Sequence, residues 1–230
     1  MLEVLNFLLL KAKALAAVCL KYAAGDGKEG ISAGDIQTLQ AAIADAEASN
    51  TDQEKAVSNE EKLTDLQNQT MAKAHNLLRK TQDAAEAEYG DNKARRKEFH
   101  IGGPKIASVK AMGTELKYAK SVAIDNLAAL KKHGFKDADI AKFDTLSTEL
   151  DTNATNQKNA RKVQKAATAD RDATVKDLRK AISEVQKSAK VVFQDQSSIL
   201  VEFESISDSH GGGGKKPPTP PPDQTKPPSK

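Results

Sequence analysis

Four histidines, one cysteine and a short basic cluster are the residues of this chain whose types could do chemistry. A di-iron site in a helical bundle would need Glu-x-x-His pairs on inward-facing helix surfaces. None of the four histidines (His75, His100, His133 and His210) has a glutamate three positions before it. The single Cys19 excludes paired-cysteine zinc sites and any disulfide within the chain. We therefore expect neither a metal site nor a cofactor.

No motif in the sequence would build an enzyme active site. A Walker loop, a G-x-S-x-G turn and a dinucleotide-binding glycine pattern are all absent. Paired acids such as Glu60 and Glu61 lie in a charged helical stretch, not in an apolar pocket that would raise the pKa of a carboxyl group. We therefore expect a protein that is not an enzyme.

One basic cluster could hold phosphate groups. Lys93, Arg95, Arg96 and Lys97 lie close together in the sequence, and such cations neutralise the phosphates of nucleic acids. No interleaved aromatic residues complete a nucleic-acid-binding motif. These four residues are candidate polyanion contacts, but nucleic acid is disfavoured as the partner.

A second candidate site lies in the C-terminal tail, residues 211–230. The tail holds seven of the eight prolines and no apolar side chain larger than proline, so we expect it to be disordered. Part of it fits the basic-x-x-P-x-x-P pattern that aromatic-lined grooves bind. The residues concerned are Lys215, Pro217, Pro218, Pro220 and Pro221. The tail is predicted to be a flexible spacer, with contact to a protein partner as the alternative.

The elements that must position these residues are predicted to be helices. Proline is absent from residues 1–103 and 105–216, and a proline in a helix interior costs about 3 kcal/mol. Apolar residues recur at helical spacing over about 2–24, 36–89, 106–132 and 140–196. Glycines separate these segments. The expected fold is all-α, an elongated antiparallel bundle of four long helices.

Two features of these helices stay open. The segments after Ile36 and Ile140 have heptad positions that are apolar at both ends and polar in the middle. Each segment is one helix with a polar seam, which the absence of glycine and proline favours, or it breaks near Asn50 and Thr155 to give six helices. Residues 197–210 either end the last helix or form a short strand.

The two halves of the chain repeat each other at a distance of 104 positions. From residue 30 to residue 91, 11 of the 62 positions have the same residue in the second half, without a gap. Such self-similarity indicates tandem helical-hairpin repeats. The predicted domains are residues 1–91 and 105–196, joined by a basic connector at 92–104, and together they would form one bundle.

The two predicted repeats differ in charge. Residues 1–91 hold 9 basic and 15 acidic side chains, whereas residues 104–196 hold 18 basic and 12 acidic ones. Opposite charges attract, and they set register and partner choice more than stability, because an exposed ion pair contributes only ~0–1 kcal/mol. We therefore predict a structural, scaffolding or adaptor protein that forms homo-oligomers or larger assemblies. The alternative is a module that binds a polyanion or a membrane surface.

The N-terminal residues do not have the pattern of a signal peptide. An acidic Glu3 precedes an apolar run of only seven residues, Val4–Leu10. No run approaches the ~20 apolar residues of a membrane span. We expect a cytoplasmic protein without a transmembrane segment, and we expect Cys19 to be a buried thiol.

Overall fold

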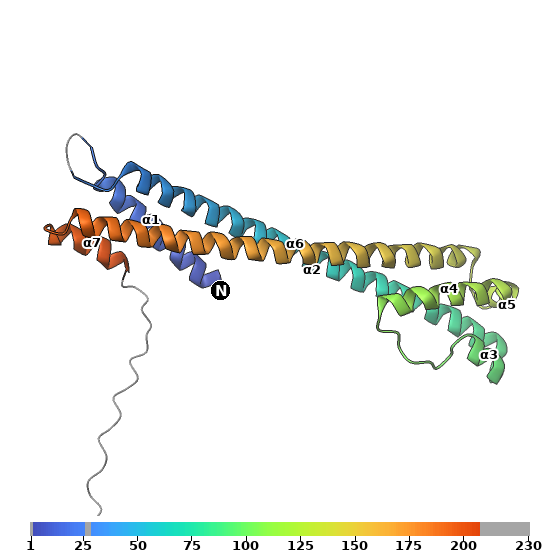
Figure 1. The fold of residues 1–230 in the computed structure, drawn as a ribbon. Coiled ribbons are helices and arrows are strands. Elements are labelled where there is room, and N and C mark those ends of the chain that lie inside the picture. Colours follow the sequence, from blue (N-terminus) through green and yellow to red (C-terminus); the bar gives the residue numbers. More distant parts are fainter. Residues whose placement is uncertain (1, 26–28, 208–230) are drawn as a thin grey trace, which may run out of the picture. The chain divides into compact units, whose positions relative to one another are not determined.

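The computed structural model describes residues 2–25 and 29–207, and this part of the chain is helical with no strand. A single isolated bridge joins Ala23 to Ile31. The prediction of an all-α chain is confirmed. The helices are α1 (Leu2–Lys21), α2 (Ala33–Tyr89), α3 (Lys93–Glu98), α4 (Val109–Asp125), α5 (Leu127–Lys131), α6 (Asp137–Val192) and α7 (Ser197–Ser207) (Figure 1).

Both long segments are single helices, as the absence of glycine and proline favoured, and the alternative of a break near Asn50 and Thr155 does not occur. Helix α2 has 57 residues and α6 has 56. Asn50 Nδ2 donates to Glu54 Oε1 (2.9 Å), and Thr155 Oγ1 donates to the Asp151 carbonyl (3.0 Å). These side chains bond one turn away within their own helix instead of capping a new one. The six-helix alternative is therefore wrong.

The segment predicted as one helix over 106–132 is divided into two. Helix α4 starts at Val109, where Ser108 Oγ accepts from the Ala111 N–H (3.2 Å), and it ends at Asp125. Asn126 separates α4 from α5 and is only 8% exposed. Its Nδ2 donates to the Val122 carbonyl (2.9 Å). A buried asparagine that bonds to the backbone of the preceding turn competes with the helix, which explains the interruption.

The connector at 92–104 contains a helix that the sequence reading missed. Asn92 Oδ1 accepts from the N–H groups of Ala94 (3.1 Å) and Arg95 (3.2 Å), an N-cap that starts α3. At the other end of the chain, residues 197–207 form α7 after a turn, so the alternative of a strand is wrong for them. The predicted tail contacts, Lys215, Pro217, Pro218, Pro220 and Pro221, lie outside the described residues, as does His210.

The chain divides into two compact units, Met1–Glu47 with Thr174–Lys230, and Ala48–Ala173. In the first unit, α1 and α7 pack with the first turns of α2 and the last turns of α6 around one apolar cluster. In the second unit, α3, α4 and α5 pack with the last turns of α2 and the first turns of α6 around another. Cys19 is buried in the first cluster with no disulfide, as predicted.

The two apolar clusters use matching positions of the sequence. Many buried residues of the first unit have a buried counterpart in the second at a distance of 104 positions. Such pairs are Cys19 and Ala123, Ile31 and Phe135, Leu39 and Phe143, Ala46 and Leu150, Leu78 and Ile182, Ala85 and Ala189, and Phe99 and Phe203. The first and last pairs lie outside the range compared in the sequence alone, and the last pair places a phenylalanine just after α3 and within α7.

Two glycines at equivalent positions are needed for different reasons. A Cβ on Gly30 would lie 2.5 Å from the backbone nitrogen of Ala24, whose N–H donates to the Ile31 carbonyl (2.9 Å). Gly134 has a φ of +83°, which side chains with a Cβ rarely adopt. Both glycines let the chain turn into the following long helix.

Within the described residues, no helix combines the length and the apolar character that crossing a membrane requires.

Candidate functional site

The second unit has a basic groove of about 1110 Å³. One wall is the part of α2 that carries His75 and Arg79, and the other is α3 with the connector that follows it. The groove collects Arg79, Arg96, Lys97 and Lys105, and Glu115 is the carboxylate among its lining residues. Apolar side chains of Leu78, Ile101 and Ile106 contribute to the lining as well.

Side chains from α2 and α4 fasten the connector and so shape the groove. Gln82 Nε2 donates to the carbonyls of Phe99 (3.2 Å) and His100 (3.1 Å). His100 lies 2.7 Å from Glu115 through Nδ1 and stacks on Tyr118 with ring centroids 4.6 Å apart. The φ of His100 is +52°, a sparsely populated conformation for a residue with a side chain. The contact with Glu115 at the edge of the ring and the stack on Tyr118 explain how it is held there.

Three cations of the groove lack a partner in the described part of the chain. Arg96 pairs with Glu86, and His100 pairs with Glu115. Arg79, Lys97 and Lys105 are exposed and make no ion pair there. Since their charges are not neutralised by neighbouring carboxylates, the groove is suited to an anionic ligand.

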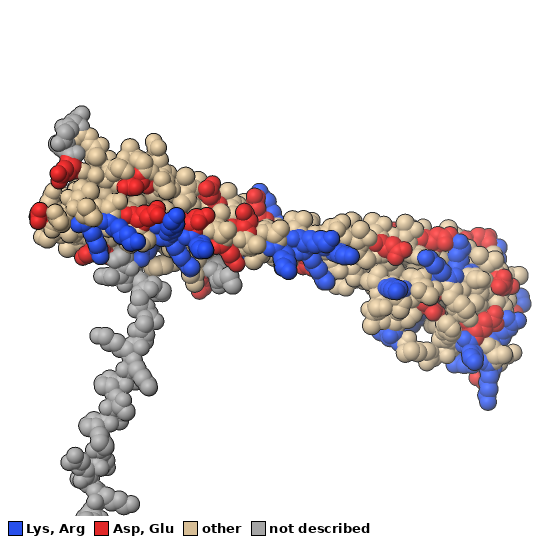
Figure 2. Space-filling model, viewed as in Figure 1, with Lys and Arg blue, Asp and Glu red and all other residues tan. Residues whose placement is uncertain are grey.

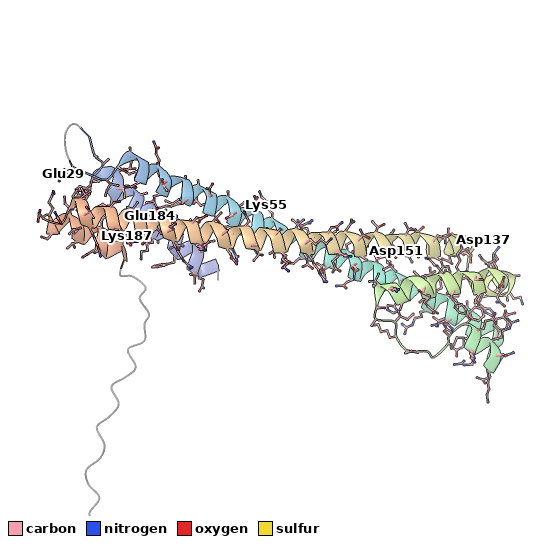
Figure 3. The ribbon with its side chains drawn as sticks, in the orientation of Figure 1. Glu29, Lys55, Asp137, Asp151, Glu184 and Lys187 are labelled. Atoms are coloured by element: carbon pink, nitrogen blue, oxygen red, sulfur yellow. The ribbon has the colours of Figure 1, made fainter. Side chains whose placement is uncertain are left out.

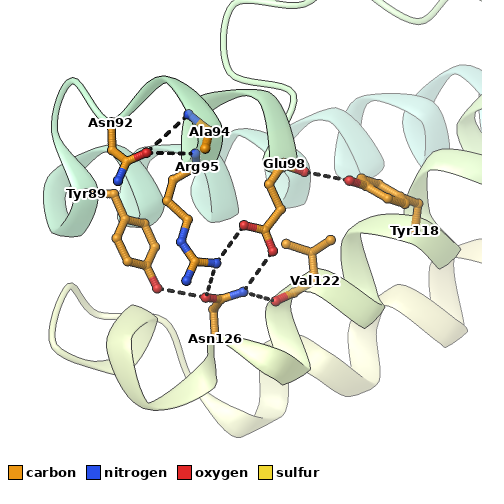
Figure 4. Close-up of polar contacts among 8 residues, drawn as sticks. All are labelled: Tyr89, Asn92, Ala94, Arg95, Glu98, Tyr118, Val122 and Asn126. Atoms are coloured by element: carbon orange, nitrogen blue, oxygen red, sulfur yellow. Dashed lines mark hydrogen bonds and ion pairs between the residues drawn. The ribbon is translucent and has the colours of Figure 1, made fainter.

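The structure separates the four predicted polyanion contacts. Arg96 and Lys97 line the groove, whereas Lys93 is exposed at the first position of α3 and does not. Arg95 turns the other way, into a polar network around Asn126 (Figure 4). Its Nη1 donates to Glu98 (2.7 Å) and to Asn126 Oδ1 (3.2 Å). Arg95 therefore joins α3 to the end of α4, and its side chain does not line the groove where a ligand would bind.

The network around Asn126 holds α3 in place. Tyr89 Oη donates to Asn126 Oδ1 (2.8 Å), and the guanidinium of Arg95 lies 5.0 Å from the centre of the Tyr89 ring. Tyr118 Oη donates to the Glu98 carbonyl at 2.9 Å (Figure 4). Glu98 raises the pKa of Arg95 through its hydrogen bond and its charge. Because Lys97 is the residue before Glu98, these contacts position one wall of the groove.

A buried carboxylate joins α6 to α2 in the same unit. The Asp139 side chain is 2% exposed and pairs with Lys80 and, at 2.8 Å, with Lys142. The Lys136 N–H donates to Asp139 Oδ2 at 3.0 Å. Burial alone would raise the pKa of Asp139, but the hydrogen bonds from Lys142, Lys80 and Lys136 outweigh it and lower the pKa to about 2. Asp139 therefore stays ionised and ties the start of α6 to α2.

A second feature of the unit is a paired segment, here called the stalk, formed by residues 51–70 of α2 and 151–171 of α6. Lys55 and Asp151 lie on its two helices (Figure 3). Polar side chains bridge the seam between the helices. Gln157 Nε2 donates to Thr64 Oγ1 (2.9 Å), Asn153 Nδ2 to Thr70 Oγ1 (3.0 Å), and Arg161 Nε to Glu60 Oε1 (3.1 Å). The pairs run in opposite directions along the two helices, so the stalk is antiparallel and its seam is polar, as the heptads predicted.

The sequence alone identified two of the four basic residues of the groove, Arg96 and Lys97. Arg79 and Lys105 carry the same charge as Arg96 and Lys97, but they lie 17 positions before Arg96 and 9 positions after it. These residues come together only because α2 packs against the connector, and the local spacing of the sequence does not specify this packing. Within the described residues, no group of three or more histidine, cysteine or acidic side chains could hold a metal ion.

Comparison of the chain with models of known families, with curated proteins and with solved structures gives no match.

Proposed function

We propose that the protein is a non-enzymatic adaptor that holds an acidic segment of a partner protein in the basic groove. The observation that carries the proposal is the set of three exposed cations, Arg79, Lys97 and Lys105, that no carboxylate of the described residues neutralises. They face one groove that the connector and α2 form together. A ligand with two or three carboxylates would replace solvent as their counter-charge.

The lining favours a peptide over a nucleic acid. Single-stranded nucleic acids are held by aromatic side chains on which bases stack, but the His100 ring is already stacked on Tyr118. Leu78, Ile101 and Ile106 give the groove apolar surface, which suits the apolar side chains of a peptide. An acidic segment that also carries leucine or a similar residue would use both parts of the lining.

The helical framework supports an adaptor role. The buried pairs at a distance of 104 positions favour an origin by duplication, with 1–91 and 105–196 as tandem helical-hairpin repeats that became one bundle. Duplicated helical frameworks serve widely as binding surfaces. In this proposal the second repeat and the connector supply the anion-binding groove, and the first repeat supplies the α2 wall.

Fluorescence anisotropy with the full chain tests the proposal. The probe is a labelled peptide of alternating glutamate and leucine, compared with a labelled single-stranded oligonucleotide of equal charge. We expect the peptide to bind and the double substitution Lys97→Glu with Lys105→Glu to weaken its binding at least tenfold. Lys110→Glu with Lys117→Glu is the matched control, because both lysines are exposed and neither lines the groove.

Two results would overturn the proposal. One is equal weakening by the groove and control substitutions, which would mean that net charge alone draws the peptide. The other is binding of the oligonucleotide without binding of the peptide, which would make the groove a nucleic-acid site.

A further inference from the structure

The exposed faces of the two stalk helices carry opposite charges at matching positions. Glu54 and Glu61 lie on α2, and Lys158 and Lys165 lie 104 positions later on α6. All four side chains are exposed. Each follows directly after a seam position (53, 60, 157 and 164) that is buried or half-buried. A glutamate of one helix therefore has a lysine as its equivalent on the other.

Each face extends beyond its matched pair. Asp65 adds to the acidic face of α2, and Lys162 adds to the basic face of α6; both are exposed. Figure 2 shows basic side chains gathered over the middle of α6. On each helix the matched residues are seven positions apart, about 10.5 Å at 1.5 Å per residue. The spacing of the acids thus equals the spacing of the lysines. Asp151 bounds the basic face on its N-terminal side.

These charges are not used inside the described part of the chain. The side chains of Glu61, Lys158, Lys162 and Lys165 make no ion pair or hydrogen bond there. Glu54 accepts only from Asn50 of its own helix. Glu60, at a seam position, pairs with Arg161 across the stalk and does not use the outward charges. The outward faces are therefore left for a partner.

The stalk is also only two helices thick, with a polar seam that buries little apolar surface. Ala56 and Ala160 are its buried apolar residues between Thr51 and Thr70 and between Thr155 and Arg171. We propose that the stalk is the surface through which two copies of this chain associate, with the acidic face of α2 against the basic face of α6 of the other copy. A two-fold arrangement uses both faces of both copies at once.

Such a dimer is weak and sensitive to salt. Exposed ion pairs are individually weak, and four to six of them would form. The Debye length falls from about 10 Å at 0.1 M salt to about 3 Å at 1 M, so high salt screens the attraction. We expect association at tens of micromolar protein in low salt and monomers at 1 M salt.

Two charge-reversed variants of the full chain test the interface by sedimentation velocity in low salt. The first, Glu54→Lys with Glu61→Lys, has lysines on both faces. The second, Lys158→Glu with Lys165→Glu, has glutamates on both faces. We expect the self-association of each variant alone to fall at least tenfold, because like charges then meet. An equimolar mixture of the two is expected to recover a complex, since one variant's lysines meet the other's glutamates.

The groove variant Lys97→Glu with Lys105→Glu is the control with the same change in charge as the second variant, and we expect it to associate like the unaltered chain. The proposal is overturned by a mixture that stays monomeric, by reversed variants that associate as well as the unaltered chain, or by an unaltered chain that is monomeric at low salt. Loss of association in the groove variant would move the interface to the groove. Since peptide binding is measured separately, either proposal can fail alone.

Discussion

Gln157 Nε2 donates a hydrogen bond of 2.9 Å to Thr64 Oγ1 across the stalk, although the residues are 93 positions apart in the chain. Together with the bond from Asn153 to Thr70 (3.0 Å), it sets the register of two long helices. A slide by one turn would leave both amides without these partners. Polar groups at seam positions thus specify register at some cost in stability, as buried asparagines do in coiled coils.

The seam bond predicts a pattern of stabilities. Gln157→Ala should lower the free energy of unfolding by about 1 kcal/mol, because it removes one hydrogen bond and leaves the Thr64 hydroxyl with only its bond to Glu60 (3.2 Å). The double substitution Thr64→Val with Gln157→Leu replaces both partners with apolar groups and should recover that loss or exceed it. Urea unfolding followed by circular dichroism measures both. A double variant less stable than Gln157→Ala would contradict this description of the seam.

The buried Asp139 predicts a dependence of stability on pH. Its pKa is lowered from 3.8 to about 2 in the folded chain, so its contribution is complete above pH 4 and is lost as the pH falls towards 2. At neutral pH, Asp139→Asn should cost about 2 kcal/mol, and it should flatten the change in stability between pH 4 and pH 2. Asp144→Asn is the control, because Asp144 is 65% exposed in its pair with Lys120. Equal effects of the two substitutions on urea unfolding at pH 7 would refute the role of Asp139.

The two equivalent glycines should respond differently to a methyl group. Gly134→Ala places an alanine at a φ of +83° and should lower the free energy of unfolding by about 1 kcal/mol. Gly30→Ala should cost more, because the new Cβ would lie 2.5 Å from the Ala24 nitrogen and the backbone must move. Gly34→Ala, in the first turn of α2 with its nearest contact at 3.8 Å, should be neutral or stabilising. Thermal unfolding of the three variants gives the order, and a Gly30→Ala variant as stable as Gly34→Ala would contradict it.

Cys19 should be unreactive in the folded chain. Its side chain is fully buried, and burial, with a smaller effect from the charge of Asp35, raises the pKa of the thiol to about 11. Since the thiolate is the nucleophile, reaction with Ellman's reagent at pH 8 should be at least a hundredfold slower than in urea. Ala17→Cys in a Cys19→Ser background places a thiol at an exposed position of the same helix and should react quickly. Equal rates for the two cysteines in the folded state would show that α1 is not packed as described.

The sequence was a good guide where one local effect decides the structure. The absence of proline and glycine from 36–89 and 140–196 predicted two long helices, and the polar heptad positions predicted the seam that Thr64 and Gln157 form. The sequence was a poor guide where side chains distant in the chain determine the local structure. Asn126 interrupts a helix because its side-chain amide bonds to Tyr89, Arg95 and the Val122 carbonyl. The residues next to Asn126 in the sequence do not indicate these contacts.

The candidate site shows the same division. The cluster of four basic residues was visible in the sequence, but its members face different ways, because Glu98 and Asn126 draw Arg95 away from the groove. Arg79 and Lys105 line the same groove as Lys97 in a structure where Gln82 bonds the connector to α2. Which cations share a surface is a property of tertiary packing and not of spacing along the chain.

The binding of an acidic peptide in the groove is tested most directly by nuclear magnetic resonance of the full chain, labelled with nitrogen-15 and titrated with the glutamate–leucine peptide. The groove and the basic face of the stalk are separate cationic surfaces of one unit, so the positions of the shifted amide signals decide between them. We predict that the shifts cluster at residues 75–82 and 96–106. Shifts centred on residues 158–165, or spread evenly over the basic residues, would contradict the assignment of the groove as the binding site.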